Sequence, residues 1–277
     1  MKIDAHQHFW YYNPDEYSWI GENMALLKSD FLPADLKFQM EQAGFSGTLV
    51  VQARQTLEET RWLLSLAEEN TFIKGVVGWV DLCSPSVKTR IDEFIKHTKF
   101  AGVRHVIHDE PDDNFMLRNE FLRGMEILQS YNLVYDLLLF PKHLPNAVKL
   151  VEKFPDQKFV LDHIGKPRIK EKLISPWKED LARLAGYKNV SCKLSGMVTE
   201  ADWQNWSPDD FIPYIDTVLG LFGSQRLMIG SDWPVCNVVA DYATVMDLVT
   251  QSIQGLSEKE KSAILGENCI EIYQLRD

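Results

Sequence analysis

The sequence predicts an α/β fold of the (β/α)8 TIM-barrel type, built as a single domain over residues 1–277. Apolar stretches of strand length alternate with longer segments of helical period along the whole chain. Eight such strands recur about every 30 residues, which fits a barrel better than an open doubly wound sheet. No Ser/Gly/Pro-rich linker divides the chain, and its excess over the roughly 250 residues of a typical barrel is expected in long loops.

The expected strands are short apolar runs, several of them uninterrupted. Runs such as TLVVQA and RLMIGS are typical of parallel strands covered on both faces. The segments between strands, such as LEETRWLLSLAEEN, place apolar residues three and four positions apart and predict amphipathic helices. The expected strands cover residues 2–9, 47–53, 73–80, 101–107, 133–140, 158–164, 189–194 and 226–231.

Two long connections carry clustered aromatic residues. The segment after the first strand (10–33) contains Trp19, and the segment after the seventh (195–211) contains Trp203 and Trp206. In a barrel both segments lie over the C-terminal mouth, where active sites are built. Each ring could simply pack its loop down. Together they favour a wall for a ring-shaped ligand, and we expect Trp203 to bind substrate.

The composition excludes several classes of partner. The 29 Lys and Arg residues against 40 Asp and Glu residues leave a net charge of −11 without a cationic cluster, which argues against nucleic acid and anionic membranes. No apolar run approaches the roughly 18 residues of a membrane span, and MKIDAHQHFW lacks the apolar core of a secretory signal. The four cysteines form no CxxC pair. We expect a cytoplasmic protein with reduced thiols whose mature chain starts here, and a homo-oligomer stays open.

Titratable side chains are expected at the ends of three apolar strands. His6 and His8 share one face of the first strand, about 7 Å apart, because side chains alternate across a strand. His163 ends the sixth strand, and Asp232 ends the eighth, which neighbours the first in a closed barrel. Each alone could be a core histidine or a helix cap. Three such coincidences at one mouth favour a site, because polar groups are costly to bury without a purpose.

The arrangement of His6, His8, His163 and Asp232 resembles that of the amidohydrolase superfamily of (β/α)8 hydrolases. Five further segments resemble the amidohydrolase-related branch of that superfamily, which contains sugar lactonases and 2-pyrone-4,6-dicarboxylate lactonase. These segments are GVRHVIHDEPD (102–112), YDLLLFPKHLP (135–145), LDHIGKP (161–167), CKLSGMVTEADW (192–203) and IGSDWPVC (229–236). The resemblance covers essentially the whole chain.

The departures from the superfamily pattern concern the metal. Its binuclear members carry a Lys or Glu on the fourth strand and a His on the fifth, whereas this chain has Arg104 and His105 on the fourth and no His on the fifth. A two-metal centre is therefore not expected. His6, His8, His163 and Asp232 remain as ligands for one divalent ion, zinc above all, and metal-free catalysis stays open because related lactonases work without an ion.

The resemblance implies a hydrolase that opens a sugar-acid lactone of the L-fucono or L-rhamnono type by attack of water on the ring carbonyl. We expect Asp232 to orient and deprotonate the water. His163, His6 and His8 are expected to stabilise the developing oxyanion, through an ion or directly.

Substrate contacts are expected from the fourth and seventh strands. Arg104 and His108 share one face, Arg104 offers a forked donor, and His105 lies on the other face. We expect Arg104, His105 and Lys193 to bind substrate, with structural ion pairs as the alternative for each. His97 and His143 are expected at the surface.

Three other functions stay open. A dicarboxylate lactonase would need several cations, and Arg104 with Lys193 is a small supply. A metal-dependent decarboxylase shares the His-x-His and Asp framework, but the GVRH and DHIGKP contexts argue against it. The remote alternative is a non-catalytic sugar-binding barrel.

Overall fold

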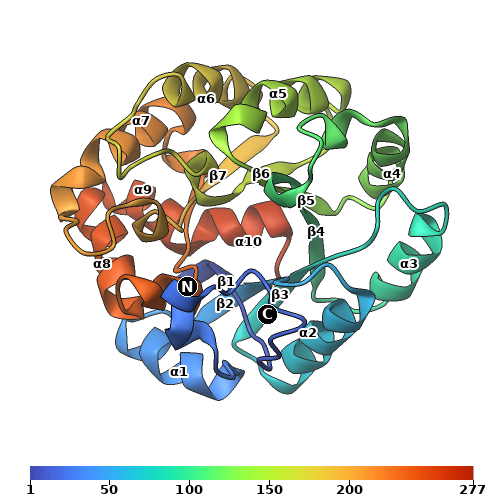
Figure 1. Ribbon diagram of the computed structural model, residues 1–277, viewed down its shortest axis with the longest axis horizontal. Helices are drawn as coiled ribbons and strands as arrows, with labels where there is room; N and C mark the ends of the chain where they lie inside the picture. The colour runs from blue at the N-terminus through green and yellow to red at the C-terminus, as the bar shows by residue number, and fades with distance from the viewer. Residues whose placement is uncertain (277) are drawn as a thin grey trace.

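The computed structural model describes residues 1–276, which form one sheet of eight parallel strands paired in chain order. The strands surround a central axis, α1 to α8 lie outside them, and α10 lies across one end of the barrel (Figure 1). The expected (β/α)8 barrel and all eight expected strands are confirmed. The strands are β1 (Ile3–Gln7), β2 (Gly47–Val51), β3 (Ile73–Gly78), β4 (Phe100–Val106), β5 (Val134–Leu138), β6 (Phe159–Leu161), β7 (Val190–Leu194) and β8 (Leu227–Ile229).

Helices α1 to α8 cover the outer face of the barrel through their apolar sides. In α2, for example, Leu63, Leu64 and Ala67 are buried at helical spacing, and Thr56 caps the first turn by accepting a hydrogen bond from the Glu59 N–H. The helices are α1 (Pro33–Gln42), α2 (Leu57–Glu69), α3 (Val87–Phe94), α4 (Asn119–Gln129), α5 (Leu144–Lys153), α6 (Trp177–Ala185), α7 (Ile212–Phe222), α8 (Tyr242–Ser252), α9 (Glu258–Ser262) and α10 (Asn268–Tyr273). None of the described helices is long and apolar enough to cross a lipid bilayer.

The barrel closes between β1 and the segment that follows β8. Gln7 forms a parallel bridge with Trp233. The His8 N–H donates to the Trp233 carbonyl at 2.7 Å, and the Asp232 N–H donates to the His6 carbonyl at 2.8 Å. This closure brings Asp232 beside both histidines of β1.

Asp4 holds the same two segments together. Its carboxylate accepts hydrogen bonds from the Ser231 N–H at 2.9 Å and the Ser231 hydroxyl at 2.7 Å, and from the His6 N–H at 3.1 Å. Complete burial raises the pKa of Asp4 to about 6. Asp4 thus fixes the backbone on both sides of the polar cluster at the mouth.

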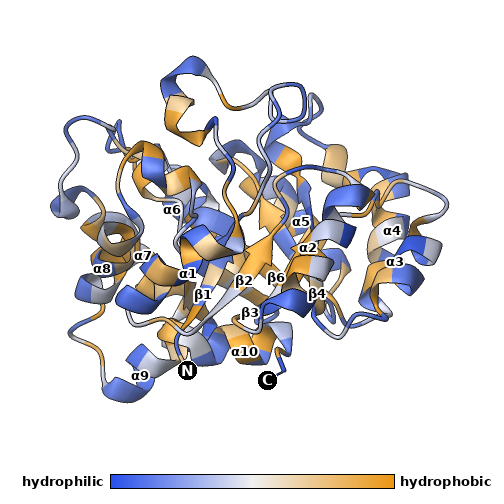
Figure 2. Ribbon diagram, turned by 90° about the horizontal axis from the view of Figure 1, so that it is seen from below, coloured by the Kyte–Doolittle hydropathy of each residue, from blue (hydrophilic) through white to orange (hydrophobic). Residues whose placement is uncertain are grey.

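The two ends of the barrel differ in polarity. At one end, Ile3, Leu49 and Val77 pack with Cys269 and Tyr273 of α10 in an apolar layer. Figure 2 shows α10 and both termini at this end and the long connections at the other. The polar side chains at the C-terminal ends of the strands therefore lie beneath those connections.

β6 and β8 end earlier than expected, at Leu161 and Ile229. The backbone turns into left-handed conformations at His163 (φ 54°) and Asp232 (φ 59°), which no strand can contain. Both residues therefore lie in turns just beyond their strands.

Candidate active site

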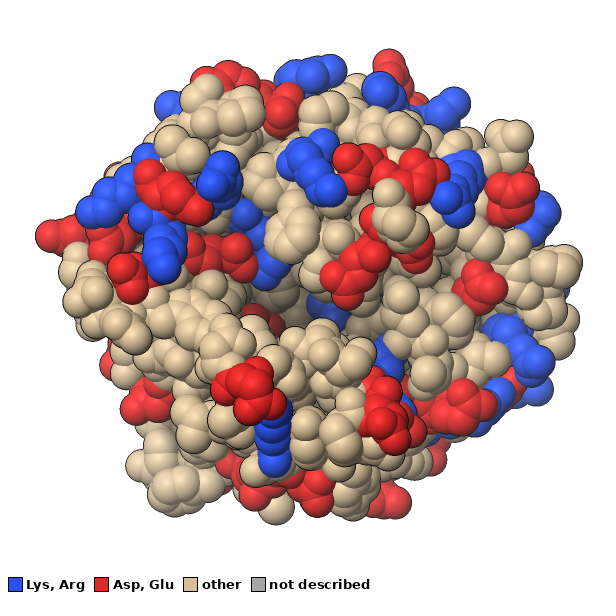
Figure 3. Space-filling view, viewed as in Figure 1, with Lys and Arg blue, Asp and Glu red and all other residues tan. Residues whose placement is uncertain are grey.

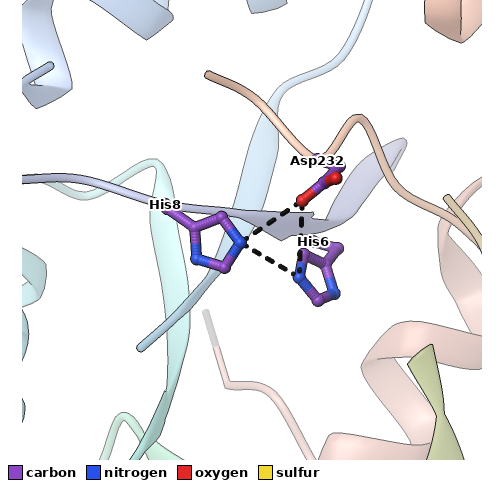
Figure 4. A group of neighbouring side chains, drawn as sticks. All are labelled: His6, His8 and Asp232. Atoms are coloured by element: carbon purple, nitrogen blue, oxygen red, sulfur yellow. Dashed lines mark hydrogen bonds and ion pairs between the residues drawn. The ribbon is translucent and has the colours of Figure 1, made fainter. Parts of the chain in front are cut away.

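His6, His8 and Asp232 converge at the floor of the barrel mouth (Figure 4). The Nε2 atoms of His6, in β1, and His8, the residue after β1, are 3.2 Å apart, so the two side chains point the same way as expected. Asp232 Oδ1 lies 3.3 Å from His8 Nε2 and 3.9 Å from His6 Nε2. All three side chains are buried. Three potential ligand atoms thus face one point.

A left-handed turn presents His163 to the same point. Four consecutive residues have positive φ: His163 (54°), Ile164 (50°), Gly165 (73°) and Lys166 (49°). Such backbone costs about 1–2 kcal/mol for each residue that has a Cβ and is found mainly where function requires it. Trp177 holds the turn by donating its indole N–H to the Ile164 carbonyl at 2.8 Å.

The imidazole of His163 completes the cluster. Its Nε2 lies 3.9 Å from Asp232 Oδ1, and its ring centroid lies 4.4 Å from that of His6. Its Nδ1 is 2.9 Å from the Ser195 hydroxyl. The structure therefore brings together all four residues expected to form the catalytic and metal site.

Hydrogen-bond partners determine which ring nitrogens carry protons. His8 Nδ1 is 2.7 Å from the Val51 carbonyl, which can only accept, so His8 Nδ1 carries the proton and Nε2 has a free lone pair. Arg104 Nη1 is 3.2 Å from His6 Nε2, and a guanidinium can only donate, so His6 Nε2 also presents a lone pair. His6 Nδ1 lies 3.3 Å from both Asp162 Oδ1 and Lys193 Nζ, and with Nε2 as the acceptor it carries its proton toward Asp162.

Burial favours the neutral forms of His6 and His163, whereas contacts with histidines favour the charged form of Asp232. Desolvation lowers the pKa of His6 and of His163 well below the usual 6.5. Burial alone would raise the pKa of Asp232, but interactions with His163 and His8 hold it below its usual 3.8. The site therefore combines neutral imidazoles with an ionised carboxylate at neutral pH.

The cluster fits a single divalent ion. Ligands of tetrahedral zinc lie about 2.0–2.1 Å from the ion and hence about 3.3 Å from one another. The separations of 3.2 Å and 3.3 Å that involve His8 match this spacing. The lone pairs of His6 and His8 face each other, which is unfavourable unless a cation lies between them. Within the described residues, His6–His8–Asp232 and His6–Asp162–His163 are the two groups with metal-ligand spacing.

A cavity of about 400 Å³ opens above the cluster, within the range of about 300–1,000 Å³ typical of small-molecule sites. His8, His163, Asp232, Arg104, His108 and Trp203 contribute to its lining. A wider cavity of about 890 Å³ adjoins it and shares Lys166, Glu200 and Trp203. Figure 3 shows a hollow near the middle of this face with acidic and basic side chains around it.

Arg104 and Trp203 reach the cavity as expected, but His105 and Lys193 do not. His105 points to the other side of β4, where its Nε2 lies 2.7 Å from Glu110 Oε1 and its ring stacks on Phe115 at 4.7 Å. Lys193 is fully buried beneath the site. The substrate contacts expected for these two residues are therefore not supported, and the ion-pair alternative describes both.

Asp162 was not expected in the site. Its carboxylate lies 2.9 Å from Lys193 Nζ and 3.0 Å from Arg104 Nη1, besides its contact with His6. Burial alone would raise its pKa, but Lys193 and His6 hold the pKa well below the usual value. An acidic residue inside the apolar run FVLDHI was the available signal.

Lys166 and Glu200 form a second unexpected pair, 2.5 Å apart where the two cavities meet. Sequence spacing offered no signal for this pair, because its members follow different strands. The surface position expected for His143 was wrong: the side chain is buried, and its Nδ1 accepts the Phe140 N–H at 3.2 Å. His97 lies at the surface as expected, beside Glu68.

The fold and the site define the class of protein: a (β/α)8 enzyme that gathers imidazoles and a carboxylate at the C-terminal mouth of its barrel. The family described as amidohydrolase matches residues 3–275, and the chain belongs to it.

Relatives with assigned names match nearly the whole chain. An L-fucono-1,5-lactonase of Burkholderia multivorans is 40% identical, over 99% of this chain and 96% of the relative. An L-fucono-1,5-lactonase of Burkholderia ambifaria is 33% identical over the same shares. A crystal structure of an amidohydrolase from Burkholderia multivorans with bound zinc superposes with a TM-score of 0.97 at 40% identity, covering 100% of both chains.

Proposed function

We propose that this protein hydrolyses a sugar-acid lactone, L-fucono-1,5-lactone or a close analogue. The observation that carries the proposal is the carboxylate of Asp232, which lies among His6, His8 and His163 on the floor of a cavity of sugar size. The names of the relatives, which are 40% and 33% identical over almost the whole chain, support the same substrate class.

Asp232 acts as the base in this proposal. Its carboxylate accepts a hydrogen bond from a water molecule and takes a proton as the water oxygen bonds to the lactone carbonyl carbon. Collapse of the tetrahedral intermediate breaks the bond to the ring oxygen, which receives that proton and becomes a hydroxyl. The hydroxy acid then ionises, so that each turnover releases one proton.

Stabilisation of the carbonyl oxygen falls to His163 and Arg104. The Nε2 atoms of His6 and His8 present lone pairs and cannot donate hydrogen bonds to the oxyanion when the rings are neutral. Their role in this proposal is therefore to bind a metal ion. If the Ser195 hydroxyl donates to His163 Nδ1, Nε2–H is free to donate. A zinc ion held by His6, His8 and Asp232 would supply Lewis acidity that polarises the carbonyl.

The charges around the cavity favour an uncharged lactone over a dicarboxylate. Arg104 is engaged with Asp162, Lys193 is buried, and Lys166 is paired with Glu200. These pairs leave little free positive charge for two substrate carboxylates. The proposal therefore favours an aldonolactone over 2-pyrone-4,6-dicarboxylate.

The direct test is acid release from a panel of aldonolactones, followed with a pH indicator and corrected for spontaneous hydrolysis. We expect the fastest release from L-fucono-1,5-lactone, slower release from other aldonolactones and none above background from 2-pyrone-4,6-dicarboxylate. Absence of enzyme-dependent acid release from every lactone would overturn the proposal.

The pH dependence follows from the two pKa directions. Because the pKa of Asp232 is lowered, the base stays ionised until the pH falls below the usual Asp value of 3.8. Because the pKa values of His6 and His163 lie well below 6.5, these rings stay neutral as the pH falls through 6.5. We expect kcat/KM to stay level from about pH 8 to about pH 5, measured by NMR of the product. An inflection near the usual histidine value would contradict this assignment.

We also propose a cytoplasmic location. In its support, Cys83, Cys192, Cys236 and Cys269 are all free thiols, and three of them are buried. Free thiols are the ordinary state of cysteine in a reducing compartment.

A further inference from the structure

Arg104 touches the nitrogen through which His6 would bind an ion. Its Nη1 lies 3.2 Å from His6 Nε2, which in turn lies 3.2 Å from His8 Nε2. The guanidinium is only 3% exposed, and it is anchored by Asp162 Oδ2 at 3.0 Å and by Gln52 Oε1 at 3.0 Å. The contact is therefore a built part of the site.

A guanidinium N–H and a metal ion need the same lone pair of His6. The N–H occupies that lone pair directly, and the positive charge of the guanidinium repels a divalent ion placed between His6 and His8. Because the pair is buried, water screens this repulsion less than it would at the surface. Metal binding must therefore shift Arg104 away from His6 or dispense with His6 as a ligand.

We propose that Arg104 is an internal cation that competes with the metal ion for His6 and thereby sets the zinc affinity of the site. With Arg104 on His6, the guanidinium partly satisfies the lone pair that faces His8. With zinc bound, the metal replaces it. The proposal concerns metal binding alone and does not depend on which lactone is hydrolysed.

The test is the dissociation constant for zinc, measured without substrate by competition with a chromophoric chelator. We expect the Arg104→Met variant to bind zinc at least about 10-fold more tightly than the unaltered protein, a change of the size seen when groups around metal ligands are altered. Arg104→Gln, which keeps an amide donor for Gln52 and Asp162 but carries no charge, should show the same direction and serves if Arg104→Met folds poorly. Unchanged or weaker zinc binding in the folded variants would overturn the proposal.

Two further variants separate competition at His6 from a general effect of charge. Lys166→Met removes another cation of the cavity, one whose Nζ pairs with Glu200, and should change zinc affinity much less. In a His6→Asn background, Arg104→Met should tighten zinc binding much less, because the shared lone pair is gone and only the charge repulsion remains. An equal gain in Lys166→Met, or an undiminished gain without His6, would each contradict the competition.

Discussion

Replacing Asp232 with asparagine should lower kcat for lactone hydrolysis by about 10³-fold while binding of the lactone ring persists. Asparagine has the same shape and can still lie beside His8, 3.3 Å away, but it cannot take a proton from water. Initial rates of acid release measure the loss. Isothermal titration with the ring-opened hydroxy-acid product, which the enzyme does not consume, measures ligand binding by both proteins.

The matched control for this variant is Asp247→Asn, which removes an exposed carboxylate from α8 and should leave kcat within a factor of two or so of the unaltered protein. Retention of more than a tenth of the activity by Asp232→Asn would remove Asp232 as the base. Ligand binding without turnover in the unaltered protein would instead favour the sugar-binding barrel.

Replacing Gly196 with alanine should lower kcat by about 10²-fold, because it displaces the ring of His163. A Cβ at Gly196 would lie 2.3 Å from His163 Nδ1 and 2.6 Å from its Cγ, closer than any real contact, and the ring cannot retreat without losing Ser195. The φ of +60° at Gly196 adds backbone strain of about 1–2 kcal/mol. Steady-state kinetics and thermal melting separate these two effects.

Gly223→Ala isolates the strain, because Gly223 also has a positive φ, +66°, but has no atom within 4 Å of an added Cβ. We expect Gly223→Ala to lower the melting temperature and leave kcat unchanged. If Gly196→Ala kept full kcat, Gly196 would not position His163.

Local pattern predicted the parts of the site that depend on one strand. A strand alternates its side chains with a period of two, which predicted that His6 and His8 face the same side. The structure shows this although β1 ends at Gln7 and its register with β2 is irregular between Asp4 and Gln7. The same rule placed Arg104 and His105 on opposite faces of β4. The structure shows Arg104 at the cavity and the ring of His105 stacked on Phe115, on the other side of the strand.

Pattern failed where several segments together determine the surroundings of a side chain. Lys193 has the same inward direction as a substrate contact would need, yet its Nζ is taken by Asp136 at 2.6 Å and by Asp162 at 2.9 Å. Neither partner is close to Lys193 in sequence. For the same reason the burial of His143 and the pairing of Lys166 with Glu200 could not be predicted.

By itself, the sequence determined the (β/α)8 architecture. Its eight apolar runs require cover on both faces of a parallel sheet, and a barrel provides this cover by its packed interior on one face and by the amphipathic helices on the other. It also determined that two imidazoles would converge at the mouth. Tertiary structure alone decided that His163 and Asp232 reach them from left-handed turns and that Arg104 touches His6. These contacts join segments far apart in the chain, and only the closed barrel brings such segments within hydrogen-bonding distance.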